Sequence, residues 1–165
     1  MGGSGSPLYS PTTSKSGKSS DNVFQRSEDK AQKRITDYQR NVFISFDIDD
    51  KPQVTLLRNQ AKDERFPFAF RDYSVKEPFE SKWKDRVRER IELTSAVIVA
   101  IGENTHKSKA VDWEIREAHR QGKKVMGVRL HSNQNHKIPS AMKEHGDRVV
   151  KWNTKKIGDE LGKDD

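Results

Sequence analysis

Short apolar runs alternate along the chain with longer stretches in which apolar residues recur every three or four positions. The runs predict strands, and the helical spacing predicts amphipathic helices. The predicted strands are residues 42–46, 66–70, 95–101, 124–130 and 149–152. The predicted helices are residues 51–61, 78–93, 111–120, 138–142 and 153–161. Strands that alternate with helices indicate right-handed βαβ units, so the predicted fold is α/β, with a flavodoxin-like parallel sheet flanked by helices.

Polar residues that follow three of these strands are candidates for a binding site. In a parallel sheet the carboxyl ends of the strands lie at one edge, where open α/β folds bind ligands. Residues 46–47, 71–72 and 102–103 are therefore expected to gather there, and the helix that contains Asp112 begins near the same edge. The candidate residues are Ser45, Phe46, Asp47, Arg71, Asp72, His106, Trp113 and Glu114.

Glu114 is the main chemical candidate, because a carboxylate can stabilise an oxocarbenium-like centre or orient a ribose hydroxyl. An acid in the first turn of a helix also interacts favourably with the helix dipole, so a structural role is an alternative. Trp113 is suited either to stack on a base or to be a core or rim aromatic. Ser45 points opposite to Phe46 along a strand and is suited either to contact a ligand or to bond the backbone.

The acidic residues after the first strand also have two interpretations. Asp47, Asp49 and Asp50 are suited to hold Mg²⁺, as the acidic cluster of a receiver domain does. The interpretation that we favour is a solvated loop that caps the next helix. Arg71 is suited to bind a phosphate through two hydrogen bonds, or to pair with Asp72 or another acid.

Composition divides the chain into a leader and a folded domain. Residues 1–40 are rich in Ser, Gly, Lys and Asp and are expected to be a flexible or disordered leader, because they cannot bury enough apolar surface to fold. Residues 41–162 are the expected domain. The net charge of +7 favours anionic partners, but acids are mixed with the Lys and Arg residues. Since no aromatic and basic platform is present, nucleic acid is disfavoured as a partner.

Several classes of protein are excluded or disfavoured by absent motifs. The chain has no cysteine, which excludes disulfides and thiolate metal sites. No apolar stretch reaches the roughly 20 residues of a membrane span, so we expect no membrane partner and a cytoplasmic location. The five histidines lack the spacing of metal ligands. No dinucleotide-binding or Walker-type glycine loop appears, and no Gly-x-Ser-x-Gly elbow indicates an esterase.

Several motifs, in the same order along the chain, resemble a known family. Residues 42–47, Val-Phe-Ile-Ser-Phe-Asp, look like the opening strand of TIR domains. Residues 102–115, with the Gly-x-Asn-Thr loop and the later Trp-Glu-Ile, are similar to the bacterial TIR-like branch that includes the Thoeris anti-phage proteins. The likeness continues through residues 118–128 and spans about residues 41–130. Ala110 stands where that family often has Trp.

The resemblance implies a fold, a reaction and roles for particular residues. It implies a flavodoxin-like fold that cleaves the nicotinamide–ribose bond of NAD⁺, either by hydrolysis or by a transfer that makes a cyclic or conjugated ADP-ribose. The catalytic Glu of the family matches Glu114, and the Ser and aromatic residue of its first strand match Ser45 and Phe46. NAD⁺ is then the substrate, and neither a cofactor nor a metal is expected.

Two partners follow from the same resemblance, and two other functions stay open. The chain is expected to form a homo-oligomer and to signal to a separate effector protein through a nucleotide messenger. A non-catalytic TIR-like adaptor that acts by self-association is the first alternative. A receiver-like phosphoacceptor is the second, but its acceptor Asp is expected at the end of the third strand, where this chain has Ala100-Ile101-Gly102.

Overall fold

Five parallel strands form one sheet in the order β2-β1-β3-β4-β5. They are β1 Asn41–Ser45, β2 Ala69–Arg71, β3 Ala96–Ile101, β4 Lys124–Arg129 and β5 Arg148–Lys151. The sequence predicted each of these strands to within three residues at either end. The parallel pairing also confirms that the carboxyl ends of β1, β2 and β3 lie at one edge of the sheet.

The structure is a computed structural model that describes residues 2–3, 23, 25–30, 41–63, 68–71 and 82–163. The chain divides into two units, residues 1–35 and residues 36–165. In the first unit, residues 23 and 25–30 are helical. The flexible leader stays a prediction, since most of residues 1–40 lie outside the described ranges. In the part of the chain that is described, no helix has the length and apolar character that a membrane crossing requires.

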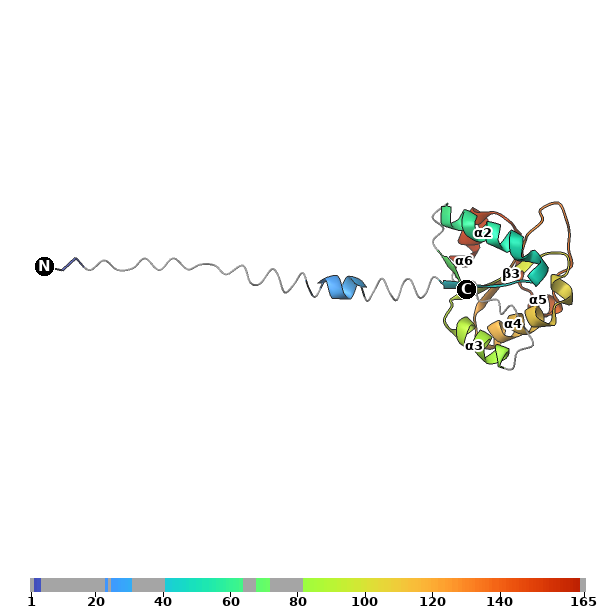
Figure 1. The fold of residues 1–165 in the computed structure, drawn as a ribbon, viewed down its shortest axis with the longest axis horizontal. Helices are drawn as coiled ribbons and strands as arrows, with labels where there is room; N and C mark the ends of the chain where they lie inside the picture. The colour runs from blue at the N-terminus through green and yellow to red at the C-terminus, as the bar shows by residue number, and fades with distance from the viewer. Residues whose placement is uncertain are drawn as a thin grey trace. The chain divides into compact units, whose positions relative to one another are not determined.

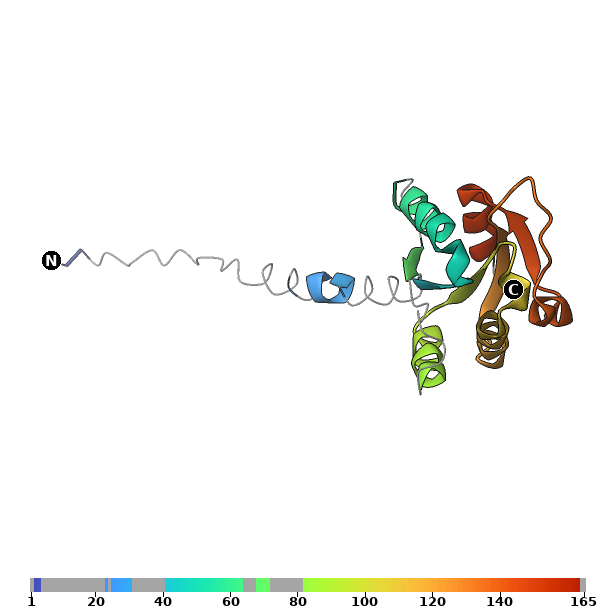
Figure 2. The same ribbon diagram turned by 45° about the vertical axis from the view of Figure 1, so that its right-hand side comes forward.

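Helices cover both faces of the sheet. They are α2 Lys51–Asp63, α3 Trp83–Glu92, α4 Lys109–Arg120, α5 Ser140–His145 and α6 Thr154–Leu161, with the short 3₁₀ turns η1 Ile48–Asp50 and η2 Thr105–Lys107. Figure 1 and Figure 2 show α2 and α6 on one side of the sheet and α3, α4 and α5 on the other. The flavodoxin-like arrangement predicted from the sequence is thus confirmed.

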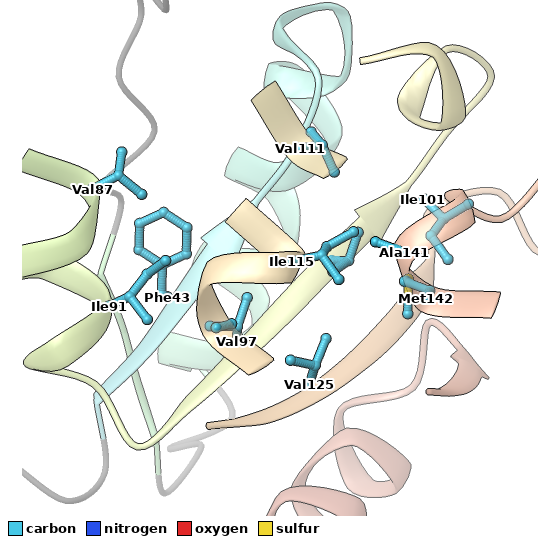
Figure 3. Packing of buried hydrophobic residues seen from close by; sticks show 12 residues of the cluster. Phe43, Val87, Ile91, Val97, Ile101, Val111, Ile115, Val125, Ala141 and Met142 are labelled. Atoms are coloured by element: carbon cyan, nitrogen blue, oxygen red, sulfur yellow. The ribbon is translucent and has the colours of Figure 1, made fainter. Parts of the chain in front are cut away.

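Alternation along the strands divides the core between the two faces. Figure 3 shows Phe43 of β1 beside α3, and Ile115 of α4 over the sheet residues Val97 and Val125. The opposite face holds Ile44, which packs with Val54 of α2. Strands that are buried on both faces need continuous apolar runs instead of alternation. This is why residues 95–101 could be recognised in the sequence.

Candidate functional site

Ser45 ends β1 on the face that α4 covers. Side chains alternate along a strand, so Ser45 shares its face with Phe43, whereas Phe46 shares the opposite face with Ile44. Ser45 is fully buried. The opposite directions of Ser45 and Phe46, expected from the sequence, are therefore present in the fold.

The start of α4 places Glu114 in the second helical turn. The side chain of Ser108 accepts a hydrogen bond from the Val111 amide and caps the helix, which begins at Lys109 and not at Val111 as the sequence predicted. The first-turn acid is therefore Asp112. An explanation of Glu114 by the helix dipole is weakened, because that effect is confined to the first turn.

Glu114 points into the protein and meets Ser45. Its residue is 6% exposed, and its neighbours on the inner face of α4 include Val111 and Ile115. The Ser45 hydroxyl donates a hydrogen bond to Oε2 of Glu114, which connects β1 to α4 across 69 positions of sequence. One alternative from the sequence was a hydrogen bond from Ser45 to the backbone. The hydroxyl donates to a side chain instead. The structure brings together two of the three candidates that matched the family motif, Ser45 and Glu114.

Burial controls the ionisation of this carboxyl group. Removal from water raises the pKa of Glu114 from 4.5 to about 7, and the hydrogen bond from Ser45 opposes this rise. Burial disfavours the charged form, whereas a donor hydrogen bond favours it. Near neutral pH the group is therefore divided between the neutral and ionised forms. Carboxyl groups perturbed in this way are frequent at functional sites.

A second buried carboxyl group fixes the loop after β3. The Gly102 amide donates to Thr105 Oγ1 at 2.8 Å, and that hydroxyl lies 3.2 Å from both Asp50 Oδ2 and the Ala100 carbonyl oxygen. The Asp50 carboxyl lies so close to Gly102 that a Cβ there would be 2.2 Å from Oδ1. Burial raises the pKa of Asp50, and the Thr105 hydrogen bond opposes that shift.

Sequence reasoning did not identify Thr105, although it is fully buried and orders this loop. The signal was present in the polar hydroxyl three residues after the glycine that ends the central strand. The sequence predicted for Asp50 a solvated loop position, with a metal ligand or a phosphoacceptor as the alternatives. Asp50 is buried and not solvated, because its carboxyl group packs against the backbone of Gly102 in the loop after β3.

The aromatic candidates have packing partners of their own. Phe46 is buried on the face covered by α2, in a cluster with Val54 and Leu130. Trp113 lies edge-on to Trp83 of α3, with ring centroids 5.1 Å apart, as a rim aromatic would. Neither ring contacts the Glu114 carboxyl through a described interaction. Substrate contacts of Phe46 and Trp113 stay predictions.

The remaining candidates lie around the same edge of the sheet. Asp47 caps η1 and accepts a hydrogen bond from the Asp49 amide at 3.1 Å, as the favoured interpretation of the acidic loop required. His106 lies in η2, and among the described residues its buried Nδ1 atom has no hydrogen-bond partner. Arg71 is the last residue of β2 and not part of the exit loop, and Asp72 lies outside the described residues.

No cluster of metal ligands is present in the described ranges, where no three His, Cys, Asp or Glu side chains are placed to hold an ion. The buried polar side chains at this edge of the sheet form two hydrogen-bonded pairs, Ser45 with Glu114 and Asp50 with Thr105.

The fold is that of a flavodoxin-like α/β domain, and TIR domains share it. The crystal structure of the TIR domain of the Toll-related receptor TRR-2 from Hydra magnipapillata is similar to this chain, with a TM-score of 0.50 and 14% identity. The match covers 70% of this chain and 86% of that chain. The TIR domains of the activated Roq1 resistosome match with a TM-score of 0.41 and 18% identity, over 55% of this chain and 57% of that chain.

A family model gives the closer assignment. The model described as "Thoeris protein ThsB, TIR-like domain" matches residues 43–135, which is more than half of the chain. The chain belongs to this family of Thoeris TIR-like domains. The matched residues include the Ser45–Glu114 pair and the whole of β3 and α4. No curated protein matches the chain.

Proposed function

We propose that this chain consumes NAD⁺, cleaves its nicotinamide–ribose bond and makes an ADP-ribose-derived signal in bacterial anti-phage defence. The observation that supports this most directly is the buried Glu114 carboxyl, which is held by Ser45 at the carboxyl end of β1. In the sequence resemblance, Glu114 is the residue that matches the catalytic Glu of the family. The family match supports the assignment to defence.

The reaction needs little from the protein besides one placed carboxylate. In NAD⁺ the nicotinamide is already a cationic leaving group, so the C1′–N bond breaks to give neutral nicotinamide and a ribosyl cation. Ionised Glu114 stabilises the positive charge that develops on the ribose. Addition of water then gives ADP-ribose and releases one proton, whereas attack by a group of the substrate itself gives a cyclic product.

The ionisation of Glu114 makes this reaction dependent on pH. Only the ionised carboxylate stabilises a cation, and its pKa of about 7 in the free protein leaves it partly protonated at neutral pH. A cation bound beside a carboxyl group favours the charged form. Binding of the positively charged nicotinamide ribose is therefore expected to promote loss of the proton. The value of kcat/KM should rise as the pH rises through about 7.

The other candidates would bind the substrate in the proposed enzyme. Phe46 and Trp113 would bind the base or ribose, and Arg71 would bind a phosphate. Asp47, Asp72 and His106 would contribute from the adjoining loops. The product would act on a separate effector protein in the cytoplasm, and self-association of the chain would assemble the active form.

The direct test is the release of nicotinamide from NAD⁺ by the purified full chain, with the products identified by mass. Glu114→Gln keeps the size of the side chain but cannot carry a negative charge, so we expect release to fall by about 10²-fold or more. Glu117→Gln is the matched control, because Glu117 lies one turn further along α4 and bonds Arg120 instead of Ser45.

Each outcome separates the candidate functions. Loss of release in Glu114→Gln with retention in Glu117→Gln supports the enzyme. Equal activity of the wild type and Glu114→Gln contradicts the catalytic role of Glu114. If the wild type releases no nicotinamide at any pH, including at concentrations at which it self-associates, the adaptor is the better description.

A further inference from the structure

Ser45, the last residue of β1, donates a hydrogen bond to Glu114. We propose that Ser45 is the positioning residue for Glu114, and that its hydroxyl fixes the orientation of the carboxyl group and favours the ionised form. The effect of this role on turnover rests on the proposed NAD⁺-consuming function, whereas its effect on the carboxyl group does not.

The geometry leaves the Ser45 hydroxyl directed into the protein. Ser45 is fully buried, and its side chain lies on the face of the sheet that α4 covers, the same face as that of Phe43. Its hydroxyl donates to Glu114 Oε2. Ser45 is poorly placed to bind substrate directly, because it is not exposed and its hydroxyl already donates to Glu114. It is well placed to act through the carboxyl group.

Within the described ranges the Glu114 carboxyl group has no second hydrogen-bond partner, and no charged neighbour adds to the effects of burial and of Ser45. The charged groups on adjoining elements are engaged elsewhere. Lys84 and Arg88 of α3 lie over the Trp113 ring, Arg88 also pairs with Glu117, and Arg116 of α4 bonds Asp112 and Glu144. Among the described groups, the Ser45 hydroxyl is thus the one that opposes the effect of burial on the ionisation of Glu114.

Loss of that donor has a definite consequence. An ionised carboxylate only accepts hydrogen bonds, so the hydroxyl stabilises it more than it stabilises the neutral acid. Without the hydroxyl, burial acts unopposed by this bond and the pKa of Glu114 rises further. The carboxyl group also loses the contact that fixes it relative to β1. Fewer molecules then carry a correctly oriented carboxylate at neutral pH.

The test follows the carboxyl group itself. The ¹³C resonance of the Glu114 carboxyl group, assigned by its absence in Glu114→Gln, is titrated in the wild type, Ser45→Ala and Ser45→Cys. We expect the wild type to titrate at pH about 7. The alanine variant should titrate about one pH unit higher, as the loss of a hydrogen bond to a charged group implies. Cysteine, a weak donor, should lie between them.

Ser95→Ala is the matched control, because the Ser95 hydroxyl donates to the Asn41 carbonyl oxygen at the opposite end of β1. This variant should titrate as the wild type does. An unchanged midpoint in Ser45→Ala and Ser45→Cys overturns the proposal. The cysteine side chain is close to that of serine in shape and only somewhat larger. If the alanine variant does not fold, the titration of Glu114 in Ser45→Cys is therefore compared with that in the wild type.

The pH profile of nicotinamide release separates this proposal from the proposed function. In an active enzyme, the midpoint of kcat/KM in Ser45→Ala should move to higher pH together with the carboxyl titration. If the titration moves but no protein form cleaves NAD⁺, the positioning role stands and the enzyme proposal fails. If NAD⁺ is cleaved but neither midpoint moves, the enzyme stands and the positioning role fails.

Discussion

The difference in free energy of unfolding between Glu114→Gln and the wild type should change with pH. It should favour the variant more at alkaline pH than at acid pH. The glutamine side chain keeps the shape and can accept the Ser45 hydrogen bond, but it never ionises. In the wild type, burial holds the pKa of Glu114 at about 7, compared with 4.5 in an exposed chain. At about 1.4 kcal/mol per pKa unit, this difference corresponds to about 3 kcal/mol.

The direction of this change in stability with pH follows from the raised pKa of Glu114. The folded pKa is raised, so Glu114 imposes no ionisation cost below the unfolded value of 4.5. As the pH rises from there to about 7, the unfolded chain loses its proton while the folded chain keeps it, and the stability of the wild type falls. Above the folded pKa the full cost persists. The glutamine variant escapes this cost entirely.

Urea unfolding of both proteins between about pH 4.5 and about pH 8.5 measures the effect. Any constant cost of the glutamine amide cancels, because only the change in the stability difference with pH is compared. Glu117→Gln should differ from the wild type by a nearly constant amount over this range, because the hydrogen bond from Arg120 lowers the pKa of Glu117 below its ordinary value of 4.5 and its stabilisation is lost only at lower pH. A pH-independent difference for Glu114→Gln would refute a buried carboxyl group of raised pKa.

Two further predictions concern the scaffold. Gly127→Ala should destabilise the protein by about 1–3 kcal/mol, because a Cβ there would lie 2.8 Å from Ile101 Cδ1 and 2.9 Å from Met142 Cε. Unchanged urea unfolding would contradict this, since it would show that the neighbouring side chains move aside without cost. Asp112→Ala should cost about 1 kcal/mol, because its Oδ1 atom accepts from the Ala141 amide at the start of α5. Hydrogen exchange of the α5 amides should become faster, and equal exchange in both proteins would contradict the capping role.

The sheet could be predicted from the sequence because its signals are local. The runs 42–46 and 95–101 are apolar throughout, which is typical of strands covered on both faces. The start of α4 was predicted two residues late. The inward-facing residues of α4 begin at Val111, whereas the helix begins at Lys109, after the Ser108 cap. A Ser directly before a helical pattern was the available signal.

The site could be predicted only as far as its residue types and the sheet edge. Glu114 was recognised from the family motif, but its contact with Ser45 joins residues 69 positions apart. Periodicity carries no information on such a contact, because it depends on how α4 lies across β1. The partner of Trp113 was missed for the same reason, since Trp83 belongs to a different helix.

Glu114 and Glu117 show why residue type and burial together do not determine chemistry. Both are glutamates on the inner side of α4, and both are 6% exposed. The pKa of Glu117 is lowered by its hydrogen bond from Arg120 of the same helix and further by the charge of Arg88, which lies on α3. Glu114 faces the end of β1, where the only described polar partner is a neutral hydroxyl, and its pKa rises. One turn of helix thus separates a carboxylate that stabilises the fold from a carboxyl group whose ionisation costs stability. The second kind is the one suited to meet a cationic substrate, because an arriving positive charge supplies the partner that the fold leaves out.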